Sequence, residues 1–128
     1  MLVLGVVAAA VVAFVLSAVY YAAATPFERR AVGPAALNRG RPASWKVATE
    51  LLRTTVVASV FAWIAQRSGD LDVRHGIVLA VLAWVGFPLV LLTGSVTWER
   101  VHPATAAMHA GDWLLKLLLI GAVLGLLH

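Results

Sequence analysis

The chain has 128 residues, of which 62% are hydrophobic and 12% are charged, far from the roughly 25% charged residues of soluble domains. It carries no cysteine, which excludes disulfides, thiolate metal ligands and a cysteine nucleophile. The net charge is +4, but the chain also contains four long apolar runs, which a basic soluble protein would not carry. The sequence is therefore typical of an integral membrane protein and not of a soluble nucleic-acid-binding protein.

Four segments are long enough to cross a bilayer, which takes about 20 helical residues. We expect these helices at about residues 2–24, 45–66, 75–96 and 103–127. Together they predict one all-α domain over residues 1–128, a polytopic membrane protein whose four transmembrane helices form an antiparallel bundle.

The first segment carries small residues at intervals of four, at Gly5, Ala9, Ala13 and Ser17. This face predicts the close approach of another helix, within the chain or in a homo-oligomer. Tyr20 and Tyr21 follow where an amphipathic ring suits the membrane interface. A cleaved signal peptide is the alternative interpretation, but no basic residues precede the apolar run.

Basic residues are distributed unequally between the connections. The connections after the first and third segments hold Arg29, Arg30, Arg39, Arg41, Lys46 and Arg100. The opposite side holds Arg67 and Arg74. By the positive-inside rule, we expect a multi-pass protein of the cell inner membrane with both termini outside the cytoplasm. The basic side chains would also contact the headgroups of membrane lipids.

The second segment begins with polar residues on one face, among them Lys46, Glu50, Arg53 and Thr54. Glu50 and Arg53 are spaced for an ion pair. One interpretation is an interfacial pair in which the arginine extends toward water. The other is a charged wall that faces Asp112.

Pro88 interrupts the third segment, where it predicts a kink that opens space in the bundle. Trp84 and Ser95 lie on the same side as Pro88. In the last segment, Gly121 and Gly125 form a G-x-x-x-G pair. This pair predicts a seam that packs on another helix of the chain or on another subunit.

The last segment also carries polar residues spaced to share one helical stripe, at Thr105, His109, Asp112 and Lys116. A lone charge inside the bilayer costs at least roughly 2.5 kcal/mol, so this stripe needs an explanation. One is a structural pair of Asp112 with Lys116, with His109 bonded to a backbone carbonyl. The other is a proton-handling site in which His109 shuttles protons.

The alternating topology predicts that polar residues from all four helices meet in the cytoplasmic half of the bundle. The candidate catalytic residues are Asp112, His109, Glu99 and Glu50. The candidate substrate-binding residues are Tyr20, Tyr21, Arg53, Trp84, Ser95, Trp98, Trp113 and Lys116. We expect no metal, because Lys116 shares the stripe, and no cofactor, because no cofactor motif is present.

Several short motifs together resemble a known bacterial family. They are Tyr20-Tyr21 with Pro26-Phe27, Gly86-Phe87, Trp98-Glu99-Arg100, Ala110-Gly111 and Gly121-Ala122. In these the chain is similar to the membrane family called domain of unknown function 1761. The resemblance implies a four-helix membrane fold and carries no established activity.

Three functions fit these observations. The favoured hypothesis is an intramembrane enzyme of isomerase, cyclase or hydrolase type that performs acid–base chemistry on a lipophilic small molecule. The alternatives are an oligomeric transporter or channel for a small ion or cation, and a structural accessory membrane protein.

Overall fold

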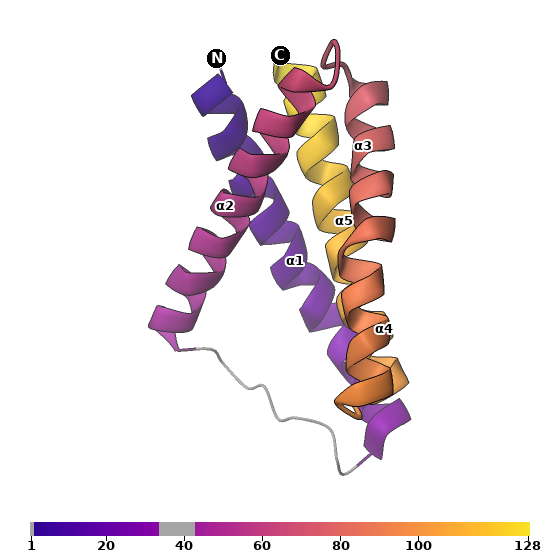
Figure 1. Ribbon diagram of the computed structural model, residues 1–128. Helices are drawn as coiled ribbons and strands as arrows, with labels where there is room; N and C mark the ends of the chain where they lie inside the picture. Colours follow the sequence, from indigo (N-terminus) through magenta and orange to yellow (C-terminus); the bar gives the residue numbers. More distant parts are fainter. Residues whose placement is uncertain (1, 34–42) are drawn as a thin grey trace.

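The computed structural model describes residues 2–33 and 43–128, and the regular elements in those ranges are all helices. They are α1 (Leu2–Val32), α2 (Ser44–Arg67), α3 (Val73–Gly86), α4 (Pro88–Trp98) and α5 (Pro103–Leu127) (Figure 1). With α3 and α4 taken as one span, the described part contains four segments long and apolar enough to cross a membrane. The predicted all-α fold with four transmembrane helices is confirmed.

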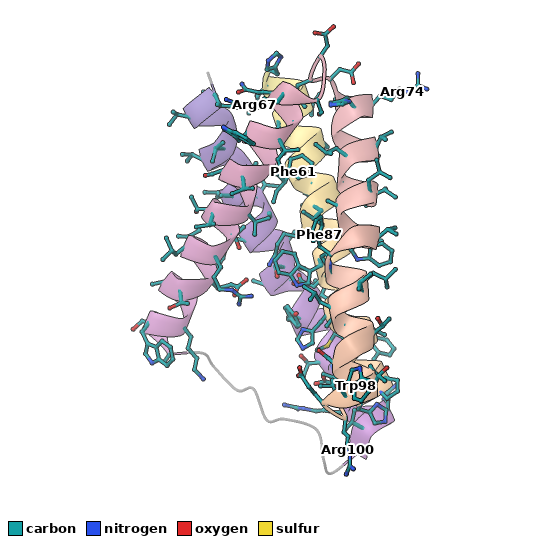
Figure 2. The ribbon with its side chains drawn as sticks, viewed as in Figure 1. Phe61, Arg67, Arg74, Phe87, Trp98 and Arg100 are labelled. Atoms are coloured by element: carbon teal, nitrogen blue, oxygen red, sulfur yellow. The ribbon has the colours of Figure 1, made fainter. Side chains whose placement is uncertain are left out.

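The four spans alternate in direction, with α4 continuing α3, and both termini lie at the same end of the bundle (Figure 1). We call the other end, where α1 and α4 finish and α2 and α5 begin, the basic end; it carries Arg29, Arg30, Lys46 and Arg100. Figure 2 shows Arg67 and Arg74 at the end with the termini and Arg100 at the basic end. The predicted loop residues Arg39 and Arg41 lie outside the described residues. That the basic end faces the cytoplasm stays a prediction.

The first helix is longer than its apolar run predicts. Instead of ending near Ala24, α1 continues through Pro26 to Val32. The hydroxyl of Thr25 donates to the Tyr21 carbonyl at 2.6 Å, next to the turn where proline has no N–H to donate. Hydropathy defines the stretch that crosses the bilayer, whereas the helical hydrogen bonding continues beyond it.

Pro88 divides the third span into two helices. Phe87 lies between α3 and α4 with φ −124° and ψ −80°. The Phe87 N–H still donates to the Ala83 carbonyl at 3.0 Å, and the Leu91 N–H donates to the Phe87 carbonyl at 2.9 Å. The predicted kink is therefore a local break at Pro88, which has no N–H to donate, and the Phe87 N–H and carbonyl keep their helical partners on either side of it.

The row of small residues on α1 packs inside the chain. Its members Gly5, Ala9, Ala13 and Ser17 are all buried. A Cβ atom placed on Gly5 would touch Leu124 of α5 at 3.4 Å. Small side chains let the two backbones approach closely, as predicted. The apolar core around this contact lies in the half of the bundle away from the basic end and includes Ala58, Phe61, Ala62, Leu117, Ile120 and Leu124.

Glycines also bring α3 against α5. A Cβ atom on Gly76 would overlap the carbonyl group of Gly121, and one on Gly125 would lie 2.5 Å from the backbone of Val73. The predicted glycine seam of α5 thus packs on another helix of the same chain. A homo-oligomer through small-residue faces stays a prediction.

The second helix packs on the bundle over only part of its length. Its buried residues are Thr54, Ala58, Phe61, Ala62 and Ala65. None of the residues from Ser44 to Arg53 is buried. Figure 1 shows this first half of α2 leaning away from α1 and α5 toward the basic end. The bundle is therefore wedge-shaped, tightly packed toward the termini and opened toward the basic end.

Candidate functional site

A cavity of about 650 Å³ occupies the open part of the wedge, between α1, α2 and α5. Its volume falls within the roughly 300–1,000 Å³ of small-molecule sites. Its lining mixes ionisable and apolar side chains: Phe14, Ser17, Ala18, Tyr21, Ala22, Thr25, Lys46, Val47, Glu50, Arg53, His109, Asp112, Trp113 and Lys116. The predicted residues that it brings together are Tyr21, Glu50, Arg53, His109, Asp112, Trp113 and Lys116.

Asp112 lies on the buried wall of this cavity and is 4% exposed. Its Oδ1 accepts a hydrogen bond from Ser17 Oγ at 2.5 Å, and its Oδ2 lies 3.5 Å from Lys116 Nζ. Asp112 and Lys116 are one turn apart on α5, so their spacing alone pairs them. Ser17 reaches them because the small-residue row of α1 packs close to α5. A carboxylate taken out of water is tolerated when both oxygens have partners in this way.

Lys116 extends the network from α5 to α2. Its side chain is 3% exposed, and Nζ donates to Glu50 Oε1 at 3.1 Å. Arg53 Nη1 then donates to Glu50 Oε2 at 2.8 Å, while the Arg53 side chain remains 60% exposed. The polar start of α2 therefore combines both interpretations. Glu50 belongs to a charged wall that faces the bundle, and Arg53 extends outward as an interfacial arginine does. The result is a polar chain across three helices that runs through Ser17, Asp112, Lys116, Glu50 and Arg53.

A second polar pair lies nearer the basic end of the cavity. Tyr21 Oη and His109 Nδ1 are 2.6 Å apart, and their ring centroids are 5.7 Å apart. The tyrosine donates this hydrogen bond when Nδ1 carries no proton, and accepts it when Nδ1 is protonated. The pair therefore places two side chains that can each donate or accept a hydrogen bond in direct contact on the cavity wall.

The cavity holds an ammonium group between its two carboxylates. Lys116 Nζ is within 3.5 Å of both Glu50 and Asp112, the position that a bridging cation would need. In residues 2–33 and 43–128, no three His, Asp or Glu side chains gather as metal ligands do.

Two predicted aromatic residues contact α5 without lining the cavity. The Tyr20 hydroxyl donates to the Met108 carbonyl at 2.7 Å. The Trp84 indole N–H donates to the Ala110 carbonyl at 2.9 Å. Both side chains thus bind backbone carbonyls of α5 outside the cavity, so their contacts here hold helices together.

The three predicted residues at the end of the third span also lie away from the cavity. Ser95 bonds back to the Leu91 carbonyl at 3.2 Å, Trp98 is 85% exposed, and Glu99 is the exposed C-cap of α4. The physical reason is the packing order: α3 and α4 pack on α5, whereas the cavity is lined by α1, α2 and α5 alone. The expectation that all four helix ends line one pocket is met by three of them.

Several cavity residues were missed as site residues. Ser17 was assigned to helix packing, although its hydroxyl is the polar member of that row. Phe14 and Thr25 lie one turn before and two turns after Ser17 on the same face of α1, and Lys46 lies one turn before Glu50 on α2. A search at helical spacing from the predicted polar residues would have found all of them.

Neither the curated proteins nor the solved structures contain a match to this chain. The family model described as "Protein of unknown function (DUF1761)" matches residues 4–125, which is nearly the whole chain and includes every residue that lines the cavity. The expected family resemblance is thereby confirmed, and the chain belongs to the family DUF1761.

Proposed function

We propose that the cavity binds a lipophilic small molecule that enters from the bilayer, and that the protein transfers protons to or from it. One observation carries this proposal: a single cavity of about 650 Å³ has both ionisable groups in its lining and a wall that is not buried in the bundle. Acid and base groups from three helices line it, and the first half of α2, with no buried residue, forms its outer wall. A membrane-dissolved substrate has access to such a wedge.

The contacts divide the polar groups into two roles. Both oxygens of Asp112 and both of Glu50 are engaged by neighbouring donors. These carboxylates therefore hold the walls together and supply fixed charge beside the substrate. Tyr21 and His109 are the pair across which a proton moves, because imidazole changes its protonation state near neutral pH. Isomerisation, cyclisation and hydrolysis all proceed by such proton transfers without a cofactor.

The same contacts weigh against one form of this chemistry. A cationic intermediate can be stabilised by an aromatic ring face. The ring of Trp113, however, already has Lys116 Nζ at 4.8 Å from its centroid. A substrate that develops positive charge beside this ring would meet a like charge, so proton transfer through anionic or neutral intermediates fits better.

Transport by an oligomer is the second candidate function. The apolar core of the bundle weighs against an ion path through a single subunit. Between the cavity and the end with the termini lies a core of buried apolar residues, among them Ala9, Ala13, Phe61, Ile120 and Leu124. An ion crossing that half would lose its hydration without a replacement ligand. An apolar core next to the cavity suits a binding site better than a continuous polar path through the bundle.

The test is to identify the small molecule that copurifies with the protein and to follow its conversion. We expect His109→Asn to abolish most of the turnover while the folded protein still binds the molecule. Turnover that survives in the double variant His109→Asn with Asp112→Asn would exclude acid–base catalysis at this site.

A further inference from the structure

The charges that line the cavity do not balance. The basic side chains are Lys46, Arg53 and Lys116, and the acidic ones are Glu50 and Asp112. Three positive and two negative charges leave an excess of at least one positive charge. A ligand that carries one negative charge would neutralise the lining.

The cavity also has more hydrogen-bond donors than its carboxylates can accept from, which again favours an anionic ligand. Glu50 and Asp112 already have partners on all four carboxylate oxygens. Arg53 has five N–H donors, of which Nη1 is engaged with Glu50. Lys46 has three donors, and its contact in the described chain is with the face of the Trp45 ring, 5.6 Å from the ring centroid. The cavity therefore has N–H donors to spare on Arg53 and Lys46, whereas its carboxylate oxygens already have partners.

The lining also has an apolar part. Phe14, Ala18, Ala22 and Val47 come from α1 and α2, the two helices that diverge toward the basic end. Ala18, Ala22 and Val47 are exposed on the protein surface, where hydrocarbon covers a membrane-spanning helix. A molecule in this wedge thus meets cations at the α2 wall and an apolar surface along α1.

We propose that the ligand of this cavity is an anionic amphiphile: a carboxylate or phosphate group, held by Lys46 and Arg53, on an apolar body that lies between α1 and α2. This inference rests on the proposed function, since it names the substrate class of the same cavity. Arg53 suits the role because its planar guanidinium binds carboxylate and phosphate groups in two-point geometry. The anion lies on the α2 wall, beside the pair of Glu50 and Lys116.

The test measures binding of defined lipids to the purified, delipidated protein by native mass spectrometry in neutral detergent. The probes are oleate, phosphatidylglycerol and phosphatidylcholine. We expect oleate or phosphatidylglycerol to bind at least roughly tenfold more tightly than phosphatidylcholine. Preference for oleate identifies a free fatty-acid-like source, and preference for phosphatidylglycerol identifies a membrane phospholipid. Equal binding of all three lipids would overturn the inference.

Matched variants separate the cavity from general surface charge. Lys46→Gln with Arg53→Gln removes the two cavity cations and should weaken binding of the preferred anionic lipid by about tenfold or more. The control, Arg67→Gln with Arg74→Gln, removes two cations at the end with the termini and should leave binding unchanged. Equal loss in both double variants would overturn the inference, because only surface charge would then matter.

The same samples distinguish this inference from the proposed function. If the protein does not select anionic lipids but still converts another molecule in a His109-dependent reaction, only the proposed ligand class is overturned. Selective binding that is abolished by the cavity variants, with no turnover of the bound lipid, would uphold the ligand class and count against the enzyme.

Discussion

Lys116 of α5 and Glu50 of α2, 66 residues apart in the chain, join across the cavity at 3.1 Å. None of the residues from Ser44 to Arg53 is buried, so apolar packing does not fix this half of α2. The position of the outer cavity wall therefore depends on an ion pair whose lysine is 3% exposed. This contact therefore couples the stability of the bundle to the shape of the cavity.

The first prediction concerns the buried lysine. Lys116→Met should lower the free energy of unfolding by roughly 3–5 kcal/mol, because it leaves the buried carboxylate of Asp112 without its cation. Thermal unfolding in detergent, followed by circular dichroism, measures the effect. Arg74→Met, which removes an exposed cation at the end with the termini, should change stability by no more than about 0.5 kcal/mol.

A double variant identifies the cause of that loss. Lys116→Met with Asp112→Asn removes the unpaired charge and keeps an acceptor for the Ser17 hydroxyl. It should recover most of the lost stability, since neutral replacements of a buried ion pair are well tolerated. A double variant as unstable as Lys116→Met alone would show that packing of the lysine stem, and not charge, is what the bundle needs.

The polar stripe of α5 was predictable because helical spacing alone places its members. His109, Asp112 and Lys116 share a face whatever the neighbouring helices are, and a charge inside a bilayer requires a partner. The partner from α2 was also predictable in part, since Glu50 lies near the start of a helix that begins at the same end of the bundle. The four-span fold followed from hydropathy in the same way.

The packing order of the helices was not predictable from one sequence. Hydropathy gives the direction of each helix but not its neighbours around the bundle. Glu99, Ser95 and Trp98 were therefore expected at the cavity because they share its membrane face, whereas α4 packs on α5 away from it. The glycine pair on α5 allowed an intrachain or an intermolecular contact, and only the position of Gly76 on α3 decides between them.

The second prediction tests the glycine contact between α3 and α5. Gly76→Ala should destabilise the protein by about 1–3 kcal/mol, because the added methyl group overlaps the backbone carbonyl of Gly121 and the helices must separate. Gly94→Ala in α4 is the control, since no atom lies within 4 Å of its Cβ position. It should be neutral or stabilising by up to about 1 kcal/mol, because alanine favours the helix. If both variants unfold at the same temperature, the close approach of α3 to α5 is wrong.

The third prediction compares the two adjacent tyrosines. Tyr21→Phe removes the hydroxyl that contacts His109 and should lower the turnover of an identified substrate by roughly 10²–10⁴-fold. Tyr20→Phe removes a hydroxyl bonded to the Met108 carbonyl and should cost only about 1 kcal/mol of stability, with turnover kept. Steady-state kinetics on both variants measures the difference. Equal losses of turnover would assign Tyr20 to the substrate site, as its sequence position alone had indicated.

The fourth prediction fixes the orientation in the membrane. Because the chain has no cysteine, a single introduced cysteine reports its own location. In intact cells a membrane-impermeant maleimide should label Asp70→Cys, which lies in the exposed turn between α2 and α3. Ala43→Cys at the basic end should react only after the cells are permeabilised, as the positive-inside rule requires. The reverse labelling pattern would place the termini in the cytoplasm.

The fifth prediction separates binding from conduction. Proteoliposomes that contain the protein should show no proton or sodium flux above protein-free vesicles, because apolar residues such as Phe61, Ile120 and Leu124 close the bundle beyond the cavity. Fluorescent pH and sodium indicators inside the vesicles measure this. A flux that Asp112→Asn abolishes would instead make the carboxylate part of a path, and several subunits would then have to surround it. In that case the cavity would be the inner vestibule of a transporter, and neighbouring subunits would have to supply the rest of the path past the apolar core of one chain.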